Sequence, residues 1–147
     1  MKHNEILTIG YEGREIKEFI AHLKSFGVTR LIDIREVPLS RKKGFSKSAI
    51  KERLDSDHIQ YVHLRSLGCP TPIRHKLKTD WDYDYFFGAY SDYLSKNQGA
   101  IAEAHRYIAD GVICLMCFER SPEKCHRKIV AKKIKEFDGN GLKITHI

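Results

Sequence analysis

The chain has 147 residues, which fits one domain of ordinary size, and it carries a formal net charge of +7. Hydrophobic residues make up 41% of it and charged residues 31%, a balance typical of globular proteins that excludes a disordered chain. The longest apolar stretches are only strand-sized, so the sequence predicts no membrane-spanning segment. The start lacks the apolar core of a signal peptide, which favours the cytoplasm and four reduced cysteines.

Short apolar segments alternate with helical patterns, and no linker interrupts them. The predicted strands are, in chain order, residues 6–9, 31–34, 61–64, 112–118 and 143–147. The predicted helices between them are residues 16–26, 46–54, 83–94, 100–108 and 122–137. Strands that alternate with helices predict a single α/β domain over residues 1–147. We expect a mainly parallel five-stranded sheet with helices on both faces, a Rossmann-like three-layer sandwich.

Two strands and the last helix have more specific signals. The segment 112–118 is the longest apolar run and predicts a central strand buried on both faces, whereas the alternating segment 143–147 suits an edge. Ser121 followed by Pro122 is typical of a helix start. The spacing of four apolar residues predicts the buried face of that helix: Ile129, Val130, Ile134 and Phe137.

Polar, glycine and thiol residues follow the predicted strands, at the edge of the sheet where open α/β folds bind ligands. We therefore predict one basic pocket there, which binds a phosphate-bearing ligand, a nucleotide or a nucleic acid. The basic runs also fit a merely solvated surface. The predicted ligand-binding residues are Gly10, Tyr11, Gly13, Arg14, Asp33, Arg35, Arg41, Cys117, Glu119 and Arg127.

The glycines and the Asp33–Arg35 pair of this pocket each have a simpler alternative, whereas Arg127 points to a ligand. Gly10 and Gly13 would let the backbone approach a ligand, or would only allow a tight turn between strand and helix. Asp33 and Arg35 lie on one side of a strand, so they would either pair with each other or hold an anion together. Arg127 is poorly placed for the dipole at a helix N-terminus, and a bound anion would explain it.

Cys117, Cys125 and His126 allow three interpretations. Both cysteines are structural, or Cys125 is a nucleophile whose thiolate the first turn of the last helix favours, or the three residues bind a metal. Zinc sites more often use closely spaced cysteine pairs, so we assign no metal site and identify no cofactor. The second interpretation makes the protein a hydrolase or transferase with Cys125, His126 and Glu36 as catalytic residues. In a variant of it, Asp33, Glu36 and Glu119 hold a divalent metal. A metal- or redox-responsive thiol module is the remaining alternative.

Aromatic residues crowd the predicted helix at residues 83–94, beside Trp81. They form a core face, or some of their rings stack on the bases of a nucleic acid.

Four segments of the chain resemble the domain-of-unknown-function 488 family. They are residues 8–14 (Thr-Ile-Gly-Tyr-Glu-Gly-Arg), 33–45 (from Asp-Ile-Arg-Glu-Val-Pro to Gly-Phe), 63–68, and 117–127 with Cys117-Phe118-Glu119 and Cys125-His126-Arg127. Ile34 stands where family members usually have valine, a conservative difference. The resemblance implies a compact α/β domain with a polar pocket, and it implies no activity.

Overall fold

The computed structural model describes residues 4–147. Residues 1–3, on which the expectation of no signal peptide partly rests, lie outside the described part. Five strands form one sheet in the order β3-β2-β4-β1-β5, and every neighbouring pair is parallel. The strands are β1 (Glu5–Gly10), β2 (Arg30–Asp33), β3 (Gln60–His63), β4 (Ile113–Cys117) and β5 (Lys143–His146). The predicted parallel sheet is confirmed, with β4 in its interior and β5 at an edge.

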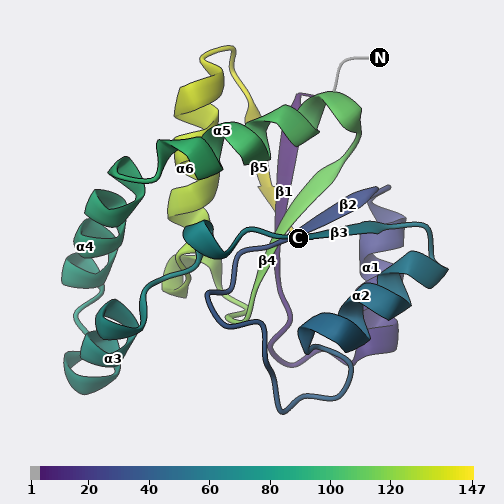
Figure 1. Cartoon of the computed structure of the whole chain (residues 1–147), viewed down its shortest axis with the longest axis horizontal. Helices are drawn as coiled ribbons and strands as arrows, with labels where there is room; N and C mark the ends of the chain where they lie inside the picture. The colour runs from purple at the N-terminus through teal and green to yellow at the C-terminus, as the bar shows by residue number, and fades with distance from the viewer. Residues whose placement is uncertain (1–3) are drawn as a thin grey trace.

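Helices cover both faces of the sheet, as the sequence predicts (Figure 1). They are α1 (Ile16–Ser25), α2 (Lys47–Ser56), α3 (Thr71–Asp80), α4 (Tyr83–Ser95), α5 (Gln98–Arg106) and α6 (Arg127–Asp138). Helices α1 and α2 pack on one face, and α4, α5 and α6 contribute buried residues to the core on the other. None of the helices in residues 4–147 is long and apolar enough to cross a membrane.

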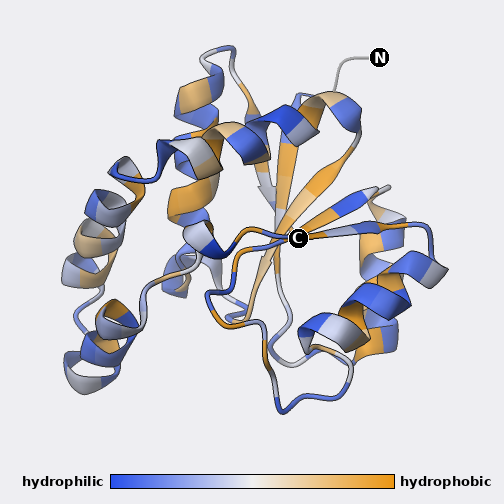
Figure 2. Ribbon diagram, in the orientation of Figure 1, coloured by the Kyte–Doolittle hydropathy of each residue, from blue (hydrophilic) through white to orange (hydrophobic). Residues whose placement is uncertain are grey.

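Two hydrophobic cores lie on the two faces of the sheet, and β4 contributes to both. Ile113 and Leu115 point into the core under α4, α5 and α6, whereas Cys114 and Met116 point into the core under α1 and α2. This alternation follows from the two-residue period of a strand. In Figure 2 the interior strands β1 and β4 are mostly hydrophobic, while hydrophilic residues mark the outer faces of the helices.

The last helix begins later than predicted. Ser121 precedes a short 3-10 turn over Pro122–Lys124, Cys125 is extended, and α6 starts only at Arg127. The proline sets the backbone for one tight turn, closed by the bond from the Lys124 amide to the Ser121 carbonyl, and Cys125 then enters the core. Cys125 therefore lies outside the first turn of the helix, so the predicted dipole effect on its thiol is wrong.

The buried face of α6 is also shorter than predicted. Val130 and Ile134 are fully buried and Ile129 is partly buried, but Phe137 is 50% exposed. Its ring packs against the His105 ring on α5, with the ring centres 5.1 Å apart and the ring planes at 67°.

Helix α3 was not predicted. It has no buried residue, and only Ile73 and Leu77 are packed against the core. An apolar stripe this narrow gives a weak periodic signal. The helix lies beside α4, away from the sheet (Figure 1), and ends at Asp80, with Trp81 as its C-terminal cap.

Candidate functional site

A cavity of about 650 Å³ lies beyond the carboxyl ends of β1, β2 and β4. The segments that follow these strands form one wall, and α3 with the start of α4 forms the other. Of the residues predicted from sequence, six line it: Tyr11, Arg35, Glu36, Cys117, Glu119 and His126. The others lie behind its wall or away from it.

Two glycines bring the loops of this wall together. A Cβ atom on Gly10 would lie 1.7 Å from the carbonyl oxygen of Glu119, and one on Gly68 would lie 2.3 Å from the amide nitrogen of Glu36. The Tyr11 amide donates to the carbonyl of Cys117 at the end of β4, and the Glu12 amide donates to the carbonyl of Phe118 in the loop that follows. The close approach at Gly10 is therefore to the protein's own backbone. Gly13, at a φ of +75°, forms the turn into α1.

Asp33 and Arg35 form a buried ion pair. The Arg35 Nε and Nη2 atoms donate to the two carboxylate oxygens at 2.9 and 2.7 Å, and Nη1 donates to the Phe45 carbonyl and the Tyr11 hydroxyl. Burial disfavours the charged guanidinium, but the hydrogen bonds and charge of Asp33 outweigh it and raise the pKa of Arg35. The two guanidinium nitrogens that could bind an anion together, Nε and Nη2 of Arg35, are thus bonded to Asp33. This agrees with the alternative in which Asp33 and Arg35 pair with each other.

Arg127 is also used inside the protein. Its side chain is 1% exposed and donates to the Thr8 hydroxyl at 3.1 Å, to the Arg120 carbonyl at 2.9 Å and to the Glu119 carbonyl. Arg127 thus holds the loop after β4 against β1, behind the cavity wall. Arg127 lies at the start of α6 because its guanidinium binds the carbonyl groups of Glu119 and Arg120, so no bound anion is needed to explain its position.

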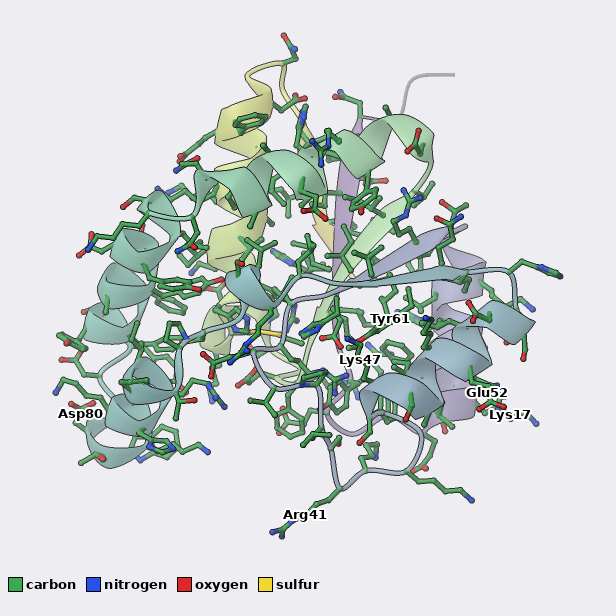
Figure 3. The ribbon with its side chains drawn as sticks, in the orientation of Figure 1. Lys17, Arg41, Lys47, Glu52, Tyr61 and Asp80 are labelled. Atoms are coloured by element: carbon green, nitrogen blue, oxygen red, sulfur yellow. A yellow bond between two sulfur atoms is a disulfide. The ribbon has the colours of Figure 1, made fainter. Side chains whose placement is uncertain are left out.

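The remaining two predicted arginines also lie outside the cavity. Arg14 donates to the carbonyls of Gly10 and Ile147, both at 3.1 Å. Arg41 is exposed at the tip of the loop before α2 and points away from the fold (Figure 3).

Cys117 and Cys125 are joined by a disulfide, drawn as a yellow bond in Figure 3. The expectation of four reduced cysteines is therefore wrong for this pair, because the end of β4 and the segment before α6 bring the two sulfur atoms together. Cys69 and Cys114 are free and buried. Burial raises the pKa of the Cys69 thiol to about 12.

His126 follows Cys125 and lines the cavity. Its Nε2 atom lies 2.8 Å from the Ile34 carbonyl oxygen, which only accepts hydrogen bonds, so Nε2 carries the proton and Nδ1 has a free lone pair. Burial lowers the pKa of His126 to about 4, which keeps the ring neutral near pH 7. Cys125, by contrast, is 1% exposed and does not line the cavity.

The three carboxylates predicted as possible metal ligands do not meet. Asp33 is paired with Arg35, while Glu36 accepts hydrogen bonds from Thr71 at 2.6 Å and Arg74 at 3.1 Å. Burial alone would raise the pKa of Glu36, but these two donors hold it below its ordinary value. Glu119 lines the cavity, and burial raises its pKa.

Comparison of the sequence with models of known protein families identifies the family of this chain. The family model described as "Domain of unknown function DUF488" matches residues 15–134. The chain belongs to the DUF488 family. This confirms the resemblance seen in the sequence motifs. No curated protein matches the chain, and no solved structure matches it either.

The DUF488 match includes the wall of the cavity that sequence reasoning missed. On α3, Arg74, Leu77 and Lys78 lie within about one helical turn of each other and share the face that lines the cavity. Trp81, the residue that caps the C-terminus of α3, also lines the cavity. Two signals for this helix were present. Thr71-Pro72 is typical of a helix start, and Ile73 and Leu77 are one turn apart.

Aromatic rings border the cavity of this DUF488 domain. Trp81 is 62% exposed and Phe118 is 45% exposed. Trp81 also has a left-handed backbone, with a φ of 53°, which is costly for a bulky side chain. On α4, Phe86 and Tyr90 are buried in the core, which agrees with the simpler interpretation of that aromatic helix.

Proposed function

We propose that this protein binds a phosphate-bearing ligand with an aromatic base, a nucleotide or a nucleic-acid strand, in the cavity between α3 and the carboxyl edge of the sheet. The observation that carries the proposal is the combination of exposed aromatic rings and unpaired lysines around one cavity. The ligand class is the one predicted from sequence. The cationic groups are different, because the predicted arginines are bonded within the protein or exposed elsewhere.

Lys78 and Lys124 supply the charge in this proposal. They line the cavity from α3 and from the turn before α6, both are exposed, and neither has an ion-pair partner within residues 4–147. Arg74 also lines the cavity, where its guanidinium is paired with Glu36 at 3.1 Å. Flexible lysines beside a cavity suit phosphate groups, which they bind as point charges.

Trp81 and Phe118 supply the surface for the base. Base stacking on an aromatic side chain contributes about 1–3 kcal/mol. An exposed tryptophan held in a costly backbone conformation is the kind of strain that clusters at binding sites.

The direct test is fluorescence, because Trp81 is the only tryptophan of the chain. We expect AMP, ADP and ATP to quench its emission with saturation, and adenosine or inorganic triphosphate alone to bind more weakly. Lys78→Ala and Lys124→Ala should each weaken binding about fivefold, roughly 1 kcal/mol for one charge-assisted contact. Lys51→Ala, on the exposed surface of α2, removes the same charge and should change nothing. Equal weakening by all three substitutions would contradict a specific site.

Salt distinguishes a bound strand from a bound nucleotide. For a single strand that contacts both lysines, a plot of the logarithm of the binding constant against the logarithm of the salt concentration should have a slope of about −1.4. Each contacted phosphate contributes about −0.7 to this slope. Lys78→Ala should reduce the magnitude of this slope by about 0.7. If the affinity does not depend on salt, the hypothesis of a bound nucleic-acid strand is rejected and that of a bound nucleotide is kept. A much steeper slope would show that strands bind elsewhere on the basic surface.

Replacing Trp81 should separate binding from stability. Trp81→Gly removes the ring and the left-handed strain together, so the free energy of unfolding should change by no more than about 1 kcal/mol. Trp81→Ala keeps the strain and should be the less stable of the two variants. Both should bind nucleotide about tenfold more weakly by calorimetry, because both lose the stacking surface. Wild-type affinity in either variant would show that the base does not stack on this ring.

The enzyme alternative has less support. Glu36 and His126 line the cavity, but Glu36 is hydrogen-bonded to Thr71 and Arg74. Cys125, the proposed nucleophile, is buried and does not line the cavity, and its sulfur is bonded to the sulfur of Cys117.

A further inference from the structure

A cluster of soft metal ligands lies at the back of the cavity. The Sγ atoms of Cys117 and Cys125 and a ring nitrogen of His126 all lie within 4.8 Å of one another, and all three side chains are buried. Within residues 4–147 this is the only group of three or more histidine, cysteine or carboxylate ligands in such a geometry. Thiolate and imidazole groups together are the ligand set that Zn²⁺ prefers.

His126 is oriented as a metal ligand would be. Its Nε2 atom donates to the Ile34 carbonyl, so the lone pair is on Nδ1, which lies 3.8 Å from the Cys125 sulfur. Histidines that bind metals usually donate their other ring N–H to a carboxylate or a backbone carbonyl in this way. The contact with Ile34 thereby fixes both the tautomer and the direction of the ring.

Arg127 donates to both sulfur atoms. Its backbone amide lies 3.4 Å from the Cys125 Sγ atom, and its Nη1 atom lies 3.3 Å from the Cys117 Sγ atom. A disulfide carries no charge for such donors to stabilise, whereas two thiolates do. The surroundings of the sulfurs are therefore suited to the reduced, deprotonated pair.

We propose that the reduced form of this protein binds one Zn²⁺ ion through Cys117, Cys125 and His126. A dithiol reductant opens the disulfide and is itself oxidised to a disulfide, and zinc then displaces the protons of the two thiols. Cys117 and His126 also line the cavity, so the fourth coordination position faces it and is filled by water. The disulfide is the metal-free, oxidised state of the same site.

The test uses Co²⁺ as a spectroscopic substitute for Zn²⁺, added to the full chain after reduction with a phosphine. We expect one equivalent to bind, with a thiolate-to-cobalt band in the near ultraviolet and the intense visible absorption of tetrahedral Co²⁺. Zinc should displace the cobalt. The oxidised protein should bind neither ion at this site, because its sulfurs are bonded to each other.

Variants distinguish this site from adventitious binding. Cys117→Ser should abolish the thiolate band or shift it strongly. His126→Ala keeps both thiolates and should weaken zinc binding by more than the roughly 10–100-fold that loss of an outer-shell partner costs. Cys69→Ala is the matched control, since Cys69 is also buried and lines the same cavity, and it should bind the metal like the wild type. Unchanged spectra in Cys117→Ser, or a band lost in Cys69→Ala, would overturn the proposal, as would equal cobalt binding by the oxidised chain.

This proposal and the proposed ligand are tested independently. Nucleotide binding is measured by Trp81 emission with a chelator present, and cobalt spectra are measured without nucleotide. If the protein binds metal but no nucleotide, only the proposed function is contradicted. If it binds nucleotide but no metal, only the zinc proposal is contradicted.

Discussion

Arg127→Ala is expected to lower the free energy of unfolding by about 4 kcal/mol, in urea titrations with reductant and chelator present. The guanidinium is 1% exposed and joins the Thr8 hydroxyl to the carbonyls of Glu119 and Arg120. Its removal leaves these buried acceptors without donors, and each such loss costs about 1–3 kcal/mol. A cavity between β1 and the loop after β4 adds to the cost.

Lys132→Ala is the matched control for this prediction. Lys132 lies on the same helix, is exposed and forms no ion pair among residues 4–147, so its loss should change stability by no more than about 0.5 kcal/mol. Should Arg127→Ala fail to fold, Arg127→Lys keeps one donor group and should be intermediate in stability. A stable Arg127→Ala variant that has lost nucleotide binding would restore the sequence-based hypothesis that this arginine holds the ligand.

Asp33→Asn is expected to cost about 3–5 kcal/mol of unfolding free energy, because it leaves the buried Arg35 guanidinium without its counter-ion. Asp33 is fully buried and accepts four hydrogen bonds, from the Arg35 amide, twice from the Arg35 side chain, and from the Tyr61 hydroxyl at 2.5 Å. Asparagine has the same shape, so the change isolates the charge from the packing. Thermal and urea unfolding should agree on the loss.

The double variant Asp33→Asn with Arg35→Met identifies the cause. If the cost comes from an uncompensated charge, removal of both charges should recover part of the stability lost in Asp33→Asn alone. Additive losses in the double variant would instead mean that Arg35 acts through its bonds to Phe45 and Tyr11. Tyr61→Phe removes only a single bond and should cost about 1 kcal/mol.

Much of the fold could be predicted from the sequence because its signals are local. The apolar run at residues 112–118 is strand-sized and has no polar face, so it indicated an interior strand, and β4 lies in the interior. The alternation of strands with helices indicated parallel pairing, which the sheet confirms. The gathering of loops at one edge of the sheet follows from the same topology, since the carboxyl ends of parallel strands all meet there.

Other features give only weak local signals or depend on contacts between distant residues. Helix α3 buries little of its surface, so its apolar period is weak, yet it supplies Lys78 to the cavity, and Trp81, the residue that caps its C-terminus, also lines the cavity. The helix signal at Ser121-Pro122 corresponds only to a 3-10 turn over Pro122–Lys124, after which the chain is extended at Cys125 and buries its side chain.

The sequence by itself determined the layered α/β architecture and the edge of the sheet at which polar groups collect, because hydrophobic period and strand order are properties of local segments. Only the tertiary structure decided what each charged group does. The sequence leaves open whether Arg35 and Arg127 bind a ligand, but both are buried, and a buried guanidinium must satisfy its donors within the protein. The lysines that line the cavity, Lys78 and Lys124, have no ion-pair partner among residues 4–147, and only the packing of the folded chain brings their two segments to one cavity.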